Sequence, residues 1–306
     1  MKNNNNKDNK DFVQILPVKS DFVFKLIFGD ERNTDILREF LKSILDIPEE
    51  EYREITVVDP HVKKESAADK YSILDVKVRT KSKQIIHIEI QLKVFDEMKP
   101  RVIYGQSKLV TEQMSAGKDY DVIKRAISIV ITDENFIDNS PHYHHQFRYR
   151  TTDGTEFTNL VEINTLELSK LPENEDIIKK NPELWHWTKF IKSDNSEEVL
   201  NMIAERNPQM KKAVGFLKEL SVDDETRRMY EAREMARRDN VALMKRARKE
   251  GIAEGRQEGR QEGQQEEKIS IARSLLKTNL TIDQISQHTG LTPEQIQSLG
   301  EIHHIE

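Results

Sequence analysis

Hydrophobic residues recur every three or four positions in the first part of the chain, which predicts helices there. Ser20 and Asp21 precede the run FVFKLIF and mark the start of one helix, and Gly29 marks its end. A second helix is predicted from Thr34, where apolar residues again recur at helical spacing, to a point before Pro48. The chain therefore opens with two amphipathic helices after a polar leader.

Segments with the composition of β-strands follow these helices. They are EITVVDPHV, YSILDVKV, QIIHIEIQLKV, RAISIVIT, YHHQFRYR and LVEINTLEL. A helical stretch from about Lys99 to Ser115, closed by Gly117, separates the third strand from the fourth. This order predicts a mixed α/β (α+β) fold with a central mixed sheet and helices on its faces.

The pattern changes after Leu171, where the sequence becomes helical and increasingly charged. We therefore divide the chain into five predicted regions. These are a disordered leader (1–16), a folded core (17–171), a helical extension (172–246), a Gly/Glu/Arg repeat helix (247–268) and a small helical tail (269–306).

Composition narrows the function classes. Of the 306 residues, 33% are charged and 36% are apolar. This apolar fraction is low for one compact globule. The chain has no cysteine, which excludes disulfides, thiolate metal sites and a Cys nucleophile. The leader is too polar for a signal peptide, and no apolar run approaches the roughly 18 residues of a membrane helix. We expect a soluble, cytoplasmic protein that has no membrane partner.

The formal net charge is -6, which is not typical of a nucleic-acid-binding protein. An acidic catalytic cluster repels phosphate until a cation fills it, so the total charge decides little. Function has to be inferred from local sites.

Polar residues line one face of two neighbouring predicted strands. Alternation places Asp75 and Lys77 on one face of the first strand, and His87, Glu89 and Gln91 on one face of the second. The polar stretch RTKSKQ suits a hairpin loop, and a symmetric hairpin sets Asp75 opposite Glu89 and Lys77 opposite His87. Opposed side chains have Cβ atoms about 4.5–5.5 Å apart. Two carboxylates at that distance repel unless a positive charge lies between them.

A divalent cation held by Asp75 and Glu89 satisfies this requirement. Mg²⁺, with Mn²⁺ as an alternative ion, prefers one or two carboxylates plus waters and phosphate oxygens. Such an ion polarises a phosphoryl group and lowers the pKa of bound water for attack on phosphorus. Gln91 is a candidate to orient that water or contact the phosphate, and Lys77 is a candidate to add positive charge. The alternative is a solvated strand face, because the spacing of the two acids alone is a weak pattern.

Several ordered segments together are more specific than this pair. They are SDFVFKLIFGDERNTDILREFLKSIL, DKYSILDVKV, IIHIEIQL, RVIYGQSKLVTEQMSAGKDY and ISIVIT. From about Ser20 to Leu171 the chain resembles the Rpn family of recombination-promoting nucleases, often labelled PD-(D/E)XK family transposases. The Gly/Glu/Arg repeat and its helical tail are also typical of that family.

The resemblance implies a restriction-endonuclease-like core, metal-dependent cleavage of DNA, and a role in DNA exchange or phage-related defence. Asp75 matches the central acid of the class and Glu89 matches the acid of its E-x-K element. Gln91 occupies the position of the lysine in that element, so the resemblance does not identify the group that assists the attacking water. Asp21 matches the acid that the first helix often supplies, although an acid favoured by the helix macrodipole is an equal interpretation.

Three further residues are candidates for contacts with DNA phosphates. Arg101 and Tyr104 share a helix face just after the hairpin, and Lys25 lies on the first helix. The alternative for each is an ordinary surface or half-buried side chain. The cluster of His142, His144 and His145 is interpreted as a solvated loop rather than a metal site.

The C-terminal regions predict association between copies of the chain. Gly251, Gly255, Gly259 and Gly263 recur every four residues, which suits either a flexible linker or a helix packed closely against another helix. We favour the helix and expect a homo-oligomer. The tail resembles a helix-turn-helix, but its last helix offers no Arg or Lys to base edges, so a protein-contact module is favoured over a DNA reader.

The leading hypothesis is thus a Mg²⁺-dependent DNA endonuclease. The main alternative is a catalytically inactive DNA- or protein-binding module on the same fold. A third reading, a transposase that joins strands through a different acidic triad, would need a reader of transposon ends, and the sequence reveals none.

Overall fold

The computed structural model describes residues 14–58, 75–174, 178–193 and 196–301. The chain divides into two compact units, Met1–Glu234 and Met235–Glu306. Most of the predicted leader lies outside the described residues. Its end does not: Leu16 is buried, and its backbone N–H donates to Ser221 Oγ at 2.9 Å.

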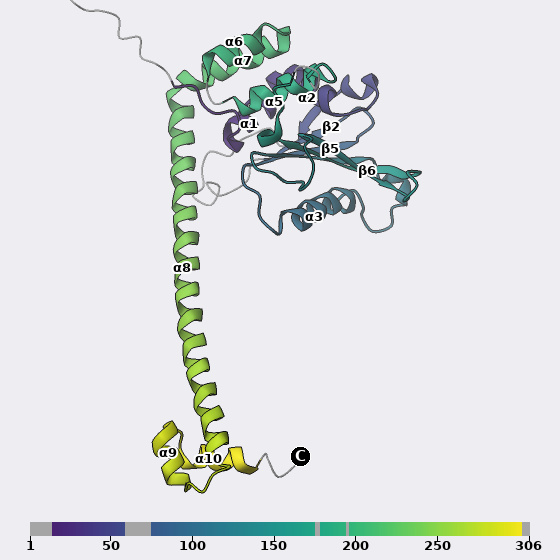
Figure 1. Cartoon of the computed structure of the whole chain (residues 1–306). Coiled ribbons are helices and arrows are strands. Elements are labelled where there is room, and N and C mark those ends of the chain that lie inside the picture. The colour runs from purple at the N-terminus through teal and green to yellow at the C-terminus, as the bar shows by residue number, and fades with distance from the viewer. Residues whose placement is uncertain (1–13, 59–74, 175–177, 194–195, 302–306) are drawn as a thin grey trace, which may run out of the picture. The chain divides into compact units, whose positions relative to one another are not determined.

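Among the described residues of the first unit, six strands form one mixed sheet in the order β1-β2-β3-β4-β6-β5 (Figure 1). The strands are β1 (Thr56–Val58), β2 (Val76–Arg79), β3 (Ile85–Gln91), β4 (Ala126–Thr132), β5 (His144–Arg150) and β6 (Glu156–Glu167). The β1–β2, β2–β3 and β5–β6 pairs are antiparallel, whereas β4 runs parallel to both β3 and β6. The predicted mixed α/β fold with a central sheet is confirmed.

The hairpin has the predicted register. Val76 pairs with Ile88 and Lys77 pairs with His87. The first predicted residues of this strand, 71–74, lie outside the described residues, and β2 begins at Val76. Continuing the same register by one residue places Asp75 across from Glu89.

Helices cover both faces of the sheet. Figure 1 shows α1, α2 and α5 on one face and α3 on the other. The helices of this unit are α1 (Asp21–Phe28), α2 (Thr34–Ile44), α3 (Met98–Thr111), α5 (Pro182–Lys192), α6 (Glu197–Ala204) and α7 (Pro208–Val222), and α8 (Asp224–Leu275) begins in it. Because both faces are covered, every residue of β4 is buried. Ile129 packs in the core of the α1 face, and its neighbour Val130 packs under α3.

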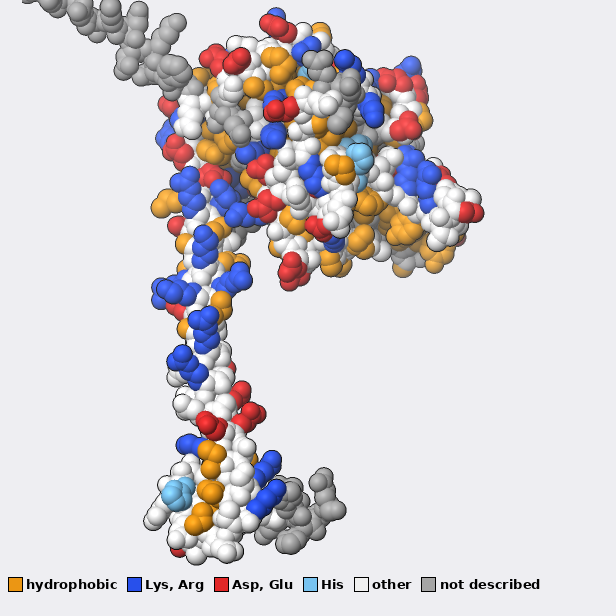
Figure 2. Space-filling model, in the orientation of Figure 1, with side chains coloured by type: hydrophobic (Ala, Val, Ile, Leu, Met, Phe, Trp, Pro, Cys, Tyr) orange, Lys and Arg blue, Asp and Glu red, His pale blue; other side chains and the backbone are white. Residues whose placement is uncertain are grey.

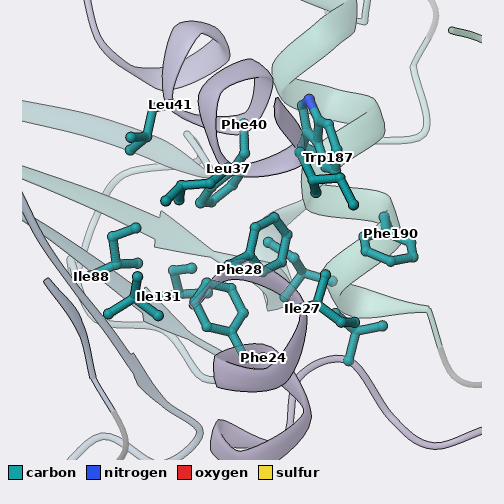
Figure 3. Close-up of a cluster of buried hydrophobic side chains, with 14 of the residues drawn as sticks. Phe24, Ile27, Phe28, Leu37, Phe40, Leu41, Ile88, Ile131, Trp187 and Phe190 are labelled. Atoms are coloured by element: carbon teal, nitrogen blue, oxygen red, sulfur yellow. The ribbon is translucent and has the colours of Figure 1, made fainter. Parts of the chain in front are cut away.

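Phe28 lies at the centre of an aromatic cluster between α1, α2 and α5 (Figure 3). Its ring centroid is 4.5 Å from that of Phe24, 4.9 Å from that of Phe40 and 6.0 Å from that of Trp187. All four side chains have an exposed fraction of 1% or less. This cluster fixes α1 against the sheet and therefore fixes where the N-terminus of α1 lies.

The second unit consists of most of α8 together with α9 (Ile282–Thr289) and α10 (Pro293–Glu301). The glycine repeat is helical throughout and belongs to α8. Apolar residues of all three helices form a small core that includes Ala272, Ile285 and Ile296. Gly290 ends α9 with a φ of 69°, a left-handed conformation that favours glycine.

No helix in the described part of the chain combines the length and the apolar character that a bilayer-spanning segment requires.

Replacement of Phe28 by Ala is expected to lower the free energy of unfolding by about 3–5 kcal/mol, since a buried ring is lost from a close-packed cluster. Denaturant unfolding followed by circular dichroism measures this change. Phe157→Ala is the matched control, because Phe157 is 80% exposed and its removal should change stability by no more than about 0.5 kcal/mol. Equal effects of the two substitutions would contradict the cluster's role.

Candidate active site

The candidate active site lies where β2 begins and β3 ends. The side chains of Asp75, Lys77, His87 and Glu89 are partly exposed, while the residues between them are buried on the opposite face. The alternation predicted from the sequence therefore brings these polar side chains together on the α3 face. Asp75 and Glu89 occupy the ends of adjacent strands, which gives two neighbouring carboxylates.

The carboxylate of Asp75 is held on one side and open on the other. Its Oδ2 lies 3.0 Å from His87 Nε2. Its Oδ1 is buried and has no hydrogen-bond partner among the described residues. Its backbone carbonyl accepts a hydrogen bond from Lys25 Nζ at 2.8 Å. A buried carboxylate oxygen without a donor is costly, so this atom is well placed to receive a cation.

Glu89 is largely buried beside a positive charge. Its side chain is 13% exposed, and its Oε1 lies 2.7 Å from Arg101 Nη2 on α3. Burial raises the pKa of Glu89 above its ordinary value, the positive charge of Arg101 opposes that shift, and the negative charge of Asp75 adds to it.

The other predicted members of the site differ in their surroundings. Gln91 is the last residue of β3, is partly buried and pairs with Thr132 of β4. Lys77 forms an ion pair with Glu112, so its charge is already compensated.

The first helix, α1, carries two predicted site residues, Lys25 as a contact to DNA and Asp21 as an acid of the site. Lys25 is 6% exposed and holds the Asp75 carbonyl, which does not suit a contact with a DNA phosphate. Asp21 lies one turn before Lys25 on the same side of α1, and its Oδ1 accepts the backbone N–H of Phe22 at 2.8 Å. This contact is the behaviour of an acid at a helix N-terminus.

Arg101 and Tyr104 lie on the exposed side of α3. The Arg101 side chain is 42% exposed even though it pairs with Glu89, and Tyr104 is 62% exposed with Lys108 Nζ 4.9 Å from its ring centroid. Both remain accessible to a ligand beside the acidic pair.

His87 and the pairing of Arg101 with Glu89 were missed as functional features. Alternation had already placed His87 on the same face as Glu89, which was the available signal. The Arg101 contact crosses from a helix to a strand, and strand alternation carries no information about it.

Of the histidine cluster, His142 is exposed and lies before β5, as expected for a solvated loop, whereas His144 and His145 belong to a strand. His144 and His145 begin β5, where His144 Nε2 lies 3.1 Å from Asn164 Oδ1 and His145 Nε2 lies 2.7 Å from Ser140 Oγ. Strand pairing with β6 buries them in part. Across the described ranges, no group of three or more His, Asp and Glu side chains is arranged to hold a metal ion.

The residues present fit a cation that needs few protein ligands. Mg²⁺ is usually bound through one or two carboxylates and keeps several waters. Asp75 and Glu89 offer two carboxylates, and no donor from the described part of the chain reaches Asp75 Oδ1. A zinc site of the usual three or four protein ligands does not fit this donor set.

A mixed sheet with helices on both faces, with two acids on an antiparallel hairpin, is consistent with the architecture of a PD-(D/E)XK protein. The family model for PD-(D/E)XK nuclease family transposases matches residues 18–247. The chain therefore belongs to the PD-(D/E)XK nuclease family transposases. Neither the curated proteins nor the solved structures contain a match to it.

Arg101→Ala is expected to raise the pKa of the Glu89 carboxyl group further above its ordinary value, because Arg101 favours the charged form. Carboxyl-selective NMR titration measures the effect. Lys99→Ala is a suitable control, since Lys99 pairs with Asp138 and not with Glu89. A Glu89 pKa that stays the same or falls in Arg101→Ala would show that the ion pair does not govern this group.

Proposed function

We propose that this protein is a metal-dependent DNA endonuclease whose site is formed by Asp75, Glu89 and Gln91. The observation that carries the proposal is the buried Oδ1 of Asp75, which has no hydrogen-bond partner among the residues that the structure describes, in a carboxylate that lies across the hairpin from Glu89. Membership of a nuclease family supports the reaction class. The narrower assignment to Rpn nucleases, and a role in recombination or phage defence, rest on the sequence resemblance.

Asp75 and Glu89 would hold Mg²⁺, with Mn²⁺ as a substitute. When bound, the ion supplies Lewis-acid polarisation of the phosphodiester group and favours ionisation of the attacking water. In the reaction, water adds to phosphorus and the bond from phosphorus to the departing sugar oxygen breaks.

The surrounding residues have distinct roles in this proposal. His87 contacts the Oδ2 atom of Asp75, and Lys25 donates to its backbone carbonyl. These two contacts would fix the direction of the remaining carboxylate oxygen, Oδ1. Gln91 stands at the lysine position and is assigned to orient the water or contact the phosphate. Arg101 neutralises Glu89 and is exposed enough to contact DNA, with Tyr104 beside it. Asp21 and Lys77 are assigned lesser roles, since Asp21 accepts the backbone N–H of Phe22 and Lys77 is paired with Glu112.

The alternative is a catalytically inactive DNA- or protein-binding module. The ion pair between Arg101 and Glu89 favours it, because a cation supplied by the chain itself reduces the need for a metal. The two functions differ in whether Asp75 and Glu89 bind a divalent ion and in whether DNA is cut.

Asp75→Asn and Glu89→Gln are each expected to reduce plasmid cleavage in Mg²⁺ by about 100-fold or more, since each removes an anionic ligand. The cut products are measured by gel electrophoresis, with EDTA as a metal-free control. Mn²⁺ binding, followed by the loss of the free-ion EPR signal, gives a readout that does not depend on activity. Lys99→Gln should leave both measurements unchanged.

Cleavage and Mn²⁺ binding that both survive Asp75→Asn would exclude this site. Wild-type protein that binds neither Mn²⁺ nor Mg²⁺ and leaves DNA intact would favour the binding module.

We also propose that α8 associates with α8 of a second copy through its glycine row. A Cβ atom added to Gly251, Gly255, Gly259 or Gly263 would meet no atom of the chain within 4 Å. The fold of one chain therefore does not require these glycines, although each costs the helix about 1 kcal/mol relative to Ala. Close approach of another helix explains them.

The charges of the repeat also favour one relative orientation of the two α8 helices. Successive residues on a helix are about 100° apart, so Glu254 and Glu258 flank the glycine row on one side and Arg256 and Arg260 flank it on the other. In a parallel two-fold pair, the Glu row of one helix faces the Arg row of its partner. An antiparallel two-fold pair sets like charges together, so the parallel arrangement is expected.

The double substitution Gly255→Glu and Gly259→Glu is expected to shift the protein from dimer to monomer, because it introduces four like charges into the contact. Light scattering with size-exclusion chromatography measures the mass. Gln257→Glu with Gln261→Glu is the matched control, since these positions face away from the glycine row. The same mass in both variants would contradict the proposed interface.

A further inference from the structure

One segment of α8 carries a concentrated positive charge. Residues 237–249, which we call the basic segment, contain six Lys and Arg residues and a single acid, Asp239. Its charged side chains are exposed along the helix, and Figure 2 shows Lys and Arg gathered on this part of α8. The segment that follows is different, because Glu residues there outnumber Lys and Arg.

The cations of the basic segment share one side of the helix. At 3.6 residues per turn, all but one of them lie within an arc of about 120°. They are Arg237, Arg238, Lys245, Arg248 and Lys249. The sixth, Arg246, lies outside this arc and forms an ion pair with Glu250 at 2.8 Å.

The positive charge on this side is largely uncompensated. Among the described residues, the side chains of Arg238, Lys245, Arg248 and Lys249 form no ion pair, and Lys245 and Lys249 stand one turn apart. Like charges at that spacing destabilise a helix. An exposed helix is ordinarily supported by pairs of opposite charge, as at Arg246 and Glu250, so this arrangement suits a polyanion that neutralises it.

We infer that the basic segment is a binding surface for the DNA phosphate backbone. The inference deepens the proposed nuclease function and rests on DNA being the substrate. The segment is about 18 Å long, which matches about five base pairs of duplex at 3.4 Å per step. Lys and Arg contacts to phosphates are independent of sequence, and they release counterions from the duplex.

The composition of the segment favours a duplex over an anionic membrane surface. Helices that lie on membranes bury bulky Trp, Phe and Leu residues opposite their basic face. The basic segment contains no aromatic residue, and its large apolar side chains are Val241, Leu243 and Met244. Phosphate contacts alone do not need such a face.

The test compares salt-dependent binding to a short DNA duplex in EDTA, where binding is separated from cleavage. The variant is R238Q/K245Q/R248Q/K249Q, which removes four charges and keeps residues that favour helix formation. The control, K118Q/K180Q/K211Q/K277Q, removes the same charge from exposed positions elsewhere. Circular dichroism confirms that both variants retain their helices.

We expect the slope of log affinity against log salt to fall in magnitude by about 3–4 in the variant, since each phosphate contact contributes about 0.9. Between about 50 and 200 mM salt, the wild type should then weaken about 100-fold more than the variant. The control should retain the wild-type slope, and vesicles containing anionic lipid should not bind the wild type.

An unchanged slope in the variant, or the same loss in variant and control, would overturn the inference. Binding of the wild type to anionic vesicles, lost in the variant, would assign the segment to a membrane surface instead. Cleavage is scored separately in Mg²⁺. A protein that cuts DNA but shows no change of slope refutes only the basic segment, and one that binds as expected but never cuts refutes only the nuclease.

Discussion

The candidate site depends on the cost of placing two carboxylates side by side at the edge of a buried sheet. Asp75 and Glu89 stand at the ends of adjacent antiparallel strands, and each is partly shielded from water. The chain meets part of that cost with His87 against Asp75 and Arg101 against Glu89. Within the described ranges, one oxygen of Asp75 is left without a donor. A site built for structure alone would be expected to satisfy that oxygen, and a site that binds a cation needs it.

The rest of the first unit maintains this arrangement. The aromatic cluster around Phe28 anchors α1, and α1 brings Lys25 to the carbonyl of Asp75. On the other face, Met98 and Val102 pack α3 under the sheet, which places Arg101 beside Glu89. Two cores on opposite faces thus supply the two cationic side chains that contact the hairpin. A change in either core would therefore disturb one acid more than the other.

Much of this fold was predictable because strand alternation and helix periodicity are set by residues close together in the sequence. Alternation in two adjacent strands was enough to pair Lys77 with His87 and to set Asp75 beside Glu89. Helix periodicity was enough to place α1 and α2. In contrast, the contact of Lys25 with Asp75 joins residues 50 positions apart, and no periodicity reports such a contact.

The same limit applies to buried charge. Glu162 is 1% exposed and pairs with Arg125 and Arg148, and the strand composition of its segment does not indicate that this acid is buried. The ends of the elements were also less predictable than their existence. The last strand begins at Glu156 rather than Leu160, because it extends along β5 beyond the apolar segment that identified it.

The net charge of -6 does not indicate which partners this protein binds, because positive and negative residues are concentrated in different segments of the chain. Asp75 and Glu89 concentrate negative charge at the proposed cation site, and residues 237–249 concentrate positive charge on a single helix. In the glycine repeat, Glu and Arg instead occupy opposite sides of one row, where they are suited to pair between copies. The charges of these segments suit different interactions, and they offset one another only when the net charge of the whole chain is added up. For such a chain, the sign of the charge on each segment carries the information about partners.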